Sequence, residues 1–399
     1  MESPDSALAP VTTNDTAPPA PTRRWRLAMP AWRGALEALL LPVGALAVSM
    51  VLFGIFCAWN GAAPLSVFSS IYTAAFGSWY SIQNTLVRAA PLMLCALCTA
   101  IPIRLGLVII GNEGALLIGG LCATLVGLRM PESSPMAVHL AMAAAGMLAG
   151  GLWIMAAGAA KYYRGVNETI STLLMNYVAI ALLAQSVNTW IKDPESLNKP
   201  SSFPIPDEQM LQPLLGWLGE LGAKFLHWND DQVQDFQGQN ALHWGLAFGL
   251  IACVFAWFLI QKTTFGFQVR TIGANIRAAR VAGLAVGPIT LITCFLAGTF
   301  PGLAGMVEVA AIHGRANESL NAGYGYSGIL VAFLARQNPL GCVFISVLLG
   351  GLLASGGILQ REHHLPDATI HVFEGIVFLV ILFSESLYGR WKFFQDKSA

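Results

Sequence analysis

The chain carries little charge for its length. Only 11% of its 399 residues are Asp, Glu, Lys or Arg, and 55% are hydrophobic, whereas a soluble domain carries roughly 25% charged residues. So few charges cannot cover a surface that faces water. The composition therefore excludes an ordinary soluble domain and predicts an all-α polytopic membrane protein. The formal net charge of zero also argues against a nucleic-acid partner.

Several motifs that carry chemistry are missing as well. The sequence has no G-x-x-x-x-G-K-[ST] phosphate loop, so we expect it neither to hydrolyse ATP itself nor to bind another cofactor. It shows no Ser/His/Asp set and no His/Cys/Asp cluster with the spacing of metal ligands, so neither an enzyme nor a metal site is expected. Cys95 and Cys98 form a C-x-x-C, but they lie inside the apolar stretch Leu92–Ile101. A pair of small core residues is therefore favoured there over a metal or redox site.

Long apolar runs dominate what is present. A membrane-spanning helix needs about 20 largely apolar residues, and on that basis we expect about ten spans. The eighth run is too short to cross alone, so we expect a half-helix or a tilted span there. The runs are Leu39–Ala58, Leu86–Ile103, Leu105–Leu128, Ala137–Ala159, Glu168–Val187, Ala241–Ile260, Val286–Ala310, Ser327–Leu334, Leu340–Leu353 and Ile370–Leu387.

The basic residues predict the orientation of these spans. With the N-terminus inside, fifteen of the 22 Lys and Arg residues face the cytoplasm, six face outward and Arg88 lies in a span. This bias follows the positive-inside rule, so both termini are expected in the cytoplasm. We accordingly divide the chain into a disordered, basic-ended segment (1–34), a transmembrane domain (35–390) and a cytoplasmic tail (391–399).

One long loop, 189–240, is expected on the external side. It carries eight acidic residues against three lysines, and Leu211–Phe225 could form an amphipathic helix on the outer membrane surface. Contact with a delivered ligand or docking protein and an insertion without a role remain equally open for this loop.

A short polar segment, Gly266–Leu284, lies within a cytoplasmic loop that spans 262–285. It contains three arginines and no acidic residue, and Asn275–Ala282 has good helix formers behind an Asn cap. The segment could contact a soluble partner, or it could serve only to fix the topology.

Polar side chains inside the apolar runs are candidates for a pathway. A charge at the bilayer centre costs roughly 2.5–3.5 kcal/mol on insertion scales, so Glu113 and Glu308 should face a cavity or a partner. Asn112 adjoins Glu113, and the flanking glycines suggest a break in the helix. A structural role, with Glu113 paired to Arg88 or Arg104, is the competing interpretation.

Two further segments place polar or aromatic groups close together. Thr172 and Asn176 lie four residues apart on one helix face, where they can line a cavity or pack helices. Asn167, Glu168 and Thr169 are interpreted as a helix start on the cytoplasmic side, where an acidic first turn complements the helix dipole. For Glu168 this role is favoured over contact with the substrate. Tyr324 and Tyr326 alternate with glycine, which suits either stacking on a flat ring or an ordinary turn.

Four of these segments share the motifs of one family. GFQVRTIGANIRAARVAGL, IIGNEGALLIG, GVNETISTLLMNY and Ala297–Gly341 resemble permeases of ATP-binding-cassette importers, in the simple-sugar and nucleoside branch of the branched-chain amino acid/sugar permease superfamily. The second segment departs from the family's N-I-G-x-E-G-Q pattern at two positions. Ile109 stands where the family has Asn, and Ala115 where it has Gln.

The resemblance implies a bacterial inner-membrane permease for nucleosides or another small ring-bearing solute. Its implied partners are a separate ATPase that uses ATP, an external substrate-binding protein, the lipid bilayer and a second permease, with a heterodimer favoured over a homodimer. The expected pathway residues are Asn112, Glu113, Thr172, Asn176, Glu308, Tyr324 and Tyr326. The expected ATPase-coupling residues are Arg270, Gly273, Asn275, Arg277, Ala278, Ala279, Arg280 and Gly283.

A self-contained secondary transporter is the alternative class. It would use the membrane carboxylates Glu113 and Glu308 for ion coupling, and inverted repeats would be expected. No convincing internal repeat is evident in the sequence.

Overall fold

The computed structural model describes residues 31–196, 199–211, 213–214, 242–366 and 368–387, and within them regular structure is helical apart from three isolated β-bridges. The α-helices are α1 (Ala31–Trp59), α2 (Pro64–Phe76), α3 (Trp79–Ala100), α4 (Asn112–Gly127), α5 (Pro135–Arg164), α6 (Glu168–Gln185), α9 (Gly245–Lys262), α10 (Thr264–Ala274), α11 (Ile276–Val281), α12 (Val286–Val307), α13 (Tyr324–Leu334), α14 (Pro339–His363) and α15 (Ala368–Leu387). The short elements are the 3₁₀-helices η1 (Pro102–Leu105), η3 (Asp207–Gln209) and η5 (Glu318–Leu320), and the π-helices η2 (Ser186–Trp190) and η4 (Glu308–His313).

The all-α, multi-pass character expected from the sequence is confirmed. Among the described residues, six helical stretches are long and apolar enough to cross a membrane, or seven if a bent pair counts as one span. That pair, Gly44–Trp59 with Pro64–Phe76, is bent by 114°. The six are Trp79–Leu105, Pro135–Arg164, Glu168–Trp190, Gly245–Lys262, Val286–His313 and Pro339–His363.

The other expected spans correspond to shorter apolar helices. The run Leu105–Leu128 is not one helix: Gly106 ends η1 in the left-handed conformation (φ +80°), and α4 begins only at Asn112. The expected half-helix near Ser327–Leu334 is α13, with 11 residues. The chain therefore contains two short helices, α4 and α13, each preceded by a non-helical stretch.

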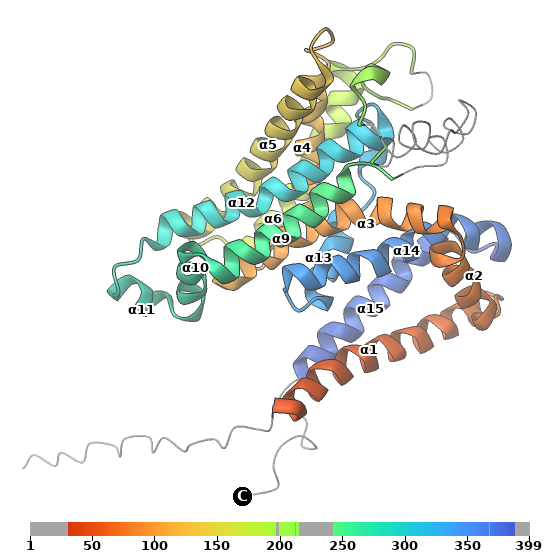
Figure 1. Ribbon diagram of the computed structural model, residues 1–399, viewed down its shortest axis with the longest axis horizontal. Helices are drawn as coiled ribbons and strands as arrows, with labels where there is room; N and C mark the ends of the chain where they lie inside the picture. Colours follow the sequence, from red (N-terminus) through yellow and green to blue (C-terminus); the bar gives the residue numbers. More distant parts are fainter. Residues whose placement is uncertain (1–30, 197–198, 212, 215–241, 367, 388–399) are drawn as a thin grey trace, which may run out of the picture.

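Helix α3 runs through the middle of the molecule (Figure 1) and packs against α9, α12, α13 and α14. On one side lie α4, α5, α6, α9 and α12, and on the other α1, α2, α13, α14 and α15. Helices α5 and α12 approach closely because glycines face each other, with Gly146 and Gly150 against Gly298 and Gly302. Small residues at such crossings let apolar helices pack without bulky side chains.

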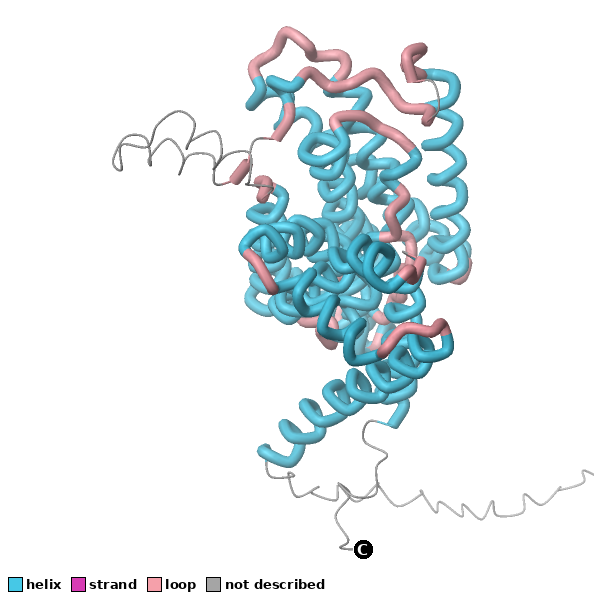
Figure 2. The backbone as a smooth tube through the Cα atoms, turned by 90° about the vertical axis from the view of Figure 1, so that its right-hand side faces the viewer, coloured by secondary structure: helices cyan, strands magenta, loops and turns pink. Residues whose placement is uncertain are grey.

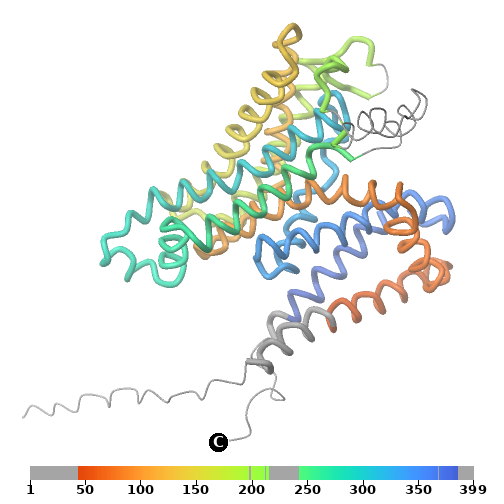
Figure 3. Tube along the Cα trace, in the orientation of Figure 1, coloured from red at the N-terminus to blue at the C-terminus, as the bar shows by residue number. Residues whose placement is uncertain are grey.

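The first and last helices lie side by side (Figure 3), and the rings of Phe53 and Phe373 stack at 4.3 Å between centroids. The start of α1 and the end of α15 lie at the same end of this pair (Figure 1). An even number of crossings would produce that arrangement. Helix α1 already begins at Ala31, whereas the rest of the expected 1–34 segment and the 391–399 tail lie outside the described residues.

The beginning of the long loop folds back on the molecule. The Ile205 N–H donates to the Gly314 carbonyl and the Ser202 N–H to the Ala316 carbonyl, both at 2.8 Å. Loops gather at this end of the helices (Figure 2). Most of the helix expected at Leu211–Phe225 lies outside the described residues.

Candidate functional site

The non-helical stretch before α4 has its backbone groups bonded by side chains of α6. The Ile110 N–H donates to Thr172 Oγ1 at 3.2 Å, and Asn176 Nδ2 donates to the Ile110 carbonyl at 2.9 Å. Thr169 Oγ1 donates to the Val108 carbonyl at 3.0 Å. Irregular backbone is tolerated in a membrane protein only where such partners exist or water is near. The expected same-face pair Thr172 and Asn176 therefore braces an interrupted span.

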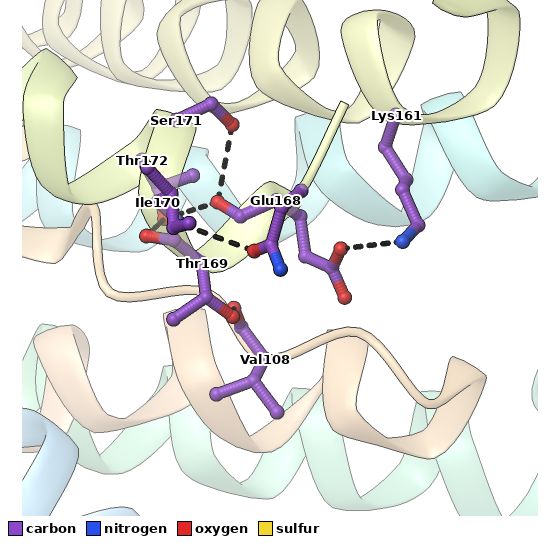
Figure 4. Close-up of polar contacts among 8 residues, drawn as sticks. Val108, Lys161, Glu168, Thr169, Ile170, Ser171 and Thr172 are labelled. Atoms are coloured by element: carbon purple, nitrogen blue, oxygen red, sulfur yellow. Dashed lines mark hydrogen bonds and ion pairs between the residues drawn. The ribbon is translucent and has the colours of Figure 1, made fainter. Parts of the chain in front are cut away.

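Figure 4 shows how α6 is anchored beside this stretch. Asn167 caps the helix by accepting from the Ile170 N–H at 3.2 Å, and Glu168 forms an ion pair with Lys161 at 2.8 Å. The helix start expected at Asn167–Thr169 is confirmed. Glu168 lies in the first turn, where its charge suits the helix dipole.

Asn112 and Glu113 are both completely buried. The two carboxylate oxygens of Glu113 accept from the backbone of the α13 start, at 3.0 Å from Gly323 N and 2.6 Å from Gly325 N. Asn112 Nδ2 donates to the Cys95 carbonyl at 3.0 Å. A carboxylate that accepts backbone N–H groups at a helix N-terminus complements both the free donors and the helix dipole. Glu113 thus joins the two interrupted spans.

Gly325 is the residue that permits this contact. A side chain there would collide with the backbone of Glu113, so the alternation of glycine and tyrosine in the sequence serves a close approach of α13 to α4. Tyr324 is 93% buried within this junction, whereas Tyr326 is 39% exposed.

A cavity of about 580 Å³ opens beside the junction. Of the expected pathway residues, Tyr326 lines it, and Asn176 lies directly behind, 3.4 Å from the tyrosine hydroxyl. The lining residues are Ile110, Leu173, Asn321, Ala322, Gly323, Tyr326, Ser327, Ile329, Leu330, His371, Glu374, Gly375 and Phe378. A concave, mostly apolar space with a few polar groups is the usual form of a small-molecule site.

Four polar lining residues escaped the sequence analysis: Asn321, Ser327, His371 and Glu374. Glu374 accepts from Ser327 Oγ at 2.8 Å and is 3.1 Å from His371 Nδ1. The available signal was a His-x-x-Glu pair in the otherwise apolar run of α15. Glu308 does not line the cavity; it lies in η4, 3.8 Å from His313 Nε2. Within the described part of the chain, no group of three or more His, Cys, Asp or Glu could hold a metal.

The basic segment forms two short helices, α10 and α11. Asn275 caps α11, accepting from the Arg277 and Ala278 N–H groups at 3.0 and 3.1 Å, so the capped helix expected here is confirmed. Arg277, Ala278 and Arg280 are exposed, whereas Ala279 is buried against the protein. Gly283 ends the helix in the left-handed conformation. The exposed face is therefore basic and has a rigid support.

Helix α10 packs against η1, the short helix that precedes the non-helical stretch before α4. Gly273 lies against the Arg104 carbonyl of η1 so closely that a side chain would collide with it. Arg104 Nη2 in turn donates to the Gln337 carbonyl at 2.9 Å, and Arg270 donates to the Ile260 carbonyl. Of the expected coupling residues, Arg270 and Gly273 thus hold the segment in place, and Arg277 and Arg280 are presented outward.

The chain is similar to known transport permeases over most of its length. Residues 81–382 match the family described as branched-chain amino acid transport system / permease component. The guanosine ABC transporter permease protein NupP of Bacillus subtilis is 29% identical, over 89% of this chain and 95% of its own length. The glucose ABC transporter permease protein TsgB13 of Haloferax volcanii is 28% identical, over 90% of each chain. The guanosine ABC transporter permease protein NupQ of Bacillus subtilis is 26% identical, over 77% of this chain and 92% of its own length.

Proposed function

The chain belongs to the family of permease components of branched-chain amino acid transport systems, and from that premise we propose that it is the membrane subunit of an ATP-binding-cassette importer for nucleosides. Its relatives are transport permeases rather than enzymes. A separate ATPase supplies the energy, and an external binding protein delivers the solute. The comparisons do not favour the secondary-transporter alternative.

The observation that carries this proposal is the exposed, Asn-capped helix α11. It presents Arg277 and Arg280 to solvent while α10 fixes its base on η1. A soluble ATPase needs a well-supported, exposed surface to bind, and arginine forms good ion pairs with acidic groups on such a partner. The same contact connects through η1 to the stretch before α4.

Replacing Arg277 and Arg280 together with Glu tests this docking surface. The reversed charges would repel an acidic partner surface, so ATP hydrolysis stimulated by the loaded binding protein should fall at least about tenfold. Insertion into the membrane should be unchanged because both side chains are exposed. The measurement is ATPase activity of the purified complex in liposomes, with and without the loaded binding protein, and Arg164→Glu, at an exposed arginine that ends α5, is the charge-reversal control. Undiminished stimulation in the double variant would contradict the proposal.

We further place both termini in the cytoplasm of a bacterial inner membrane, with about ten crossings. The shorter helices α4 and α13, each with its preceding stretch, then count as one crossing apiece. The paired ends of α1 and α15 support an even number. A C-terminal reporter that is active only in the cytoplasm tests this topology, and an inactive reporter on a folded protein would contradict it.

Nucleosides are the proposed substrates because the sequence motifs resemble the nucleoside branch and because two of the relatives named above are guanosine permeases. The glucose permease among the relatives makes sugars the competing substrate class. Uptake of tritiated guanosine, uridine and glucose by the reconstituted importer decides between them.

A further inference from the structure

Helix α15 brings a carboxylate and an imidazole to the cavity. Glu374 and His371 lie three residues apart on one face, and both line the cavity together with Ser327 and Tyr326. The Glu374 side chain is 10% exposed, whereas that of His371 is 54% exposed. Ionisable groups are rare in apolar spanning helices, and where they occur they face a pathway or a partner.

The hydrogen bonds of Glu374 define what it can still bind. One carboxylate oxygen accepts from Ser327 Oγ and the other lies within hydrogen-bond distance of His371 Nδ1. An ionised carboxylate only accepts hydrogen bonds, and it offers about four acceptor sites. Any further partner must therefore present N–H or O–H groups. Since Ser327 and His371 hold the carboxylate from two sides, its orientation is fixed before a solute arrives.

The rest of the cavity suits a flat, uncharged ring. Its wall is mostly apolar, and its volume of about 580 Å³ lies within the range of small-molecule sites, about 300–1,000 Å³. The Tyr326 ring is 39% exposed, and its hydroxyl is fixed by Asn176. An aromatic ring with one anchored edge offers a face for stacking.

We propose that Glu374, oriented by Ser327 and His371, is the hydrogen-bond acceptor that selects the transported solute, and that Tyr326 stacks on its ring. The solute class is a neutral, ring-bearing molecule with N–H or O–H donors along one edge, as in a nucleoside. This inference rests on the proposed function and deepens it. It assigns selectivity within the membrane to residues of α13 and α15 rather than to the binding protein alone.

The first test is uptake by the complete importer in liposomes. Glu374→Gln keeps the volume, removes the charge and places an N–H donor where an acceptor is needed. We expect guanosine uptake per assembled complex to fall about tenfold or more, and the ratio of guanosine to glucose uptake to change. Ser327→Ala should give a smaller loss because it frees the carboxylate without removing it. Glu362→Gln, an exposed glutamate at the end of α14, is the matched control and should stay within twofold.

The second test measures binding of the solute in the cavity, independently of transport. Ala322→Cys places a thiol in the cavity lining without touching Glu374, Ser327 or His371, and background is low because six of the seven native cysteines are buried and Cys122 is partly buried. An aqueous thiol reagent should label the variant, and guanosine delivered by the binding protein should slow the labelling.

The outcomes separate the two claims. Unchanged uptake and unchanged substrate ratio in Glu374→Gln would overturn the inference and leave the importer proposal intact. A loss of assembled complex equal to the loss of uptake, together with labelling that guanosine does not slow, would also overturn it by showing a purely structural role. A wild-type complex that transports none of guanosine, uridine and glucose would overturn the proposed function. Labelling unaffected by all three solutes would then overturn the inference independently.

Discussion

At Glu113 a fully buried carboxylate accepts the Gly323 and Gly325 N–H groups at the start of α13. The residue therefore joins two interrupted spans, and a transport role would act through the position of α13, which also carries Tyr326 and Ser327 into the cavity. Asn112, buried beside it, bonds to α3. We retain both residues as proposed parts of the pathway machinery, acting behind the cavity wall.

Replacing Glu113 with Ala should destabilise the protein because the Gly323 and Gly325 N–H groups lose their acceptors, and the buried Gly325 N–H alone costs about 1–3 kcal/mol when it is left unsatisfied. Glu113→Gln keeps the volume and one acceptor oxygen, so its loss should be smaller. Thermal unfolding of the detergent-solubilised complex measures this order, with uptake per assembled complex measured alongside. An unfolding temperature for Glu113→Ala equal to that of the wild type would contradict the joining role.

Local residue chemistry could be predicted from the sequence where it depends on neighbours along the chain. The Asn275 and Asn167 caps follow from the preference of Asn for helix starts, and both are present. The bond between Ser327 and Glu374 joins residues 47 positions apart. The sequence around either residue does not indicate its partner. The polar side of the cavity could therefore be identified only from the three-dimensional structure.

At the scale of elements, the coupling segment connects mechanically to the interrupted span. Gly273 of α10 lies on the Arg104 carbonyl of η1, and Arg104 holds the Gln337 carbonyl in the loop between α13 and α14. A displacement of α10 would therefore move Arg104, and through Arg104 it would shift both the stretch before α4 and the end of α13. At the other end of α13, Glu113 joins its start to α4.

Gly273→Ala should uncouple ATP hydrolysis from transport. The added methyl group meets backbone rather than a flexible side chain, so α10 must shift on η1 while the exposed arginines of α11 remain. We expect solute uptake per ATP hydrolysed to fall about fivefold or more, measured in the same liposomes. Gly357→Ala, a helical glycine with open space around it, is the control. Equal coupling ratios in the two variants would show that the contact carries no movement.

The interruption before α4 shows the limit of prediction for whole elements. Residues 107–110 are apolar and continue the hydrophobic run, so a length criterion extends the span from Leu105 to Leu128. The structure leaves this stretch non-helical because Thr99, Thr169, Thr172 and Asn176 supply the backbone partners from other helices. Helix α13 was predictable as a half-helix because its apolar run is too short to cross.

At the scale of the whole molecule, the cavity is bounded by α6, α13 and α15 and remains open beside Tyr326. Helix α6, which lines the cavity through Leu173, also has exposed apolar side chains, including Leu174 and Tyr177. A pathway through the membrane needs a second wall, and we propose that a related but different permease chain provides it. The similarity to both NupP and NupQ, two guanosine permease proteins of one bacterium, supports two distinct permease chains.

This pairing predicts that the chain alone cannot form an importer. Liposomes that contain it with the ATPase, and are supplied with the binding protein, should show no guanosine uptake above background, and adding the second permease should restore uptake. Native mass spectrometry of the active complex should give one copy of each permease. Replacing Tyr177 with Arg should weaken the association because a charge at the centre of an apolar interface is left without a partner. The same change at Leu152, exposed on α5 away from the cavity lining, should leave the pairing intact. Full uptake from liposomes with this chain as the only permease would establish the homodimer instead, since its cavity would then be closed by a second copy of α6 and α15.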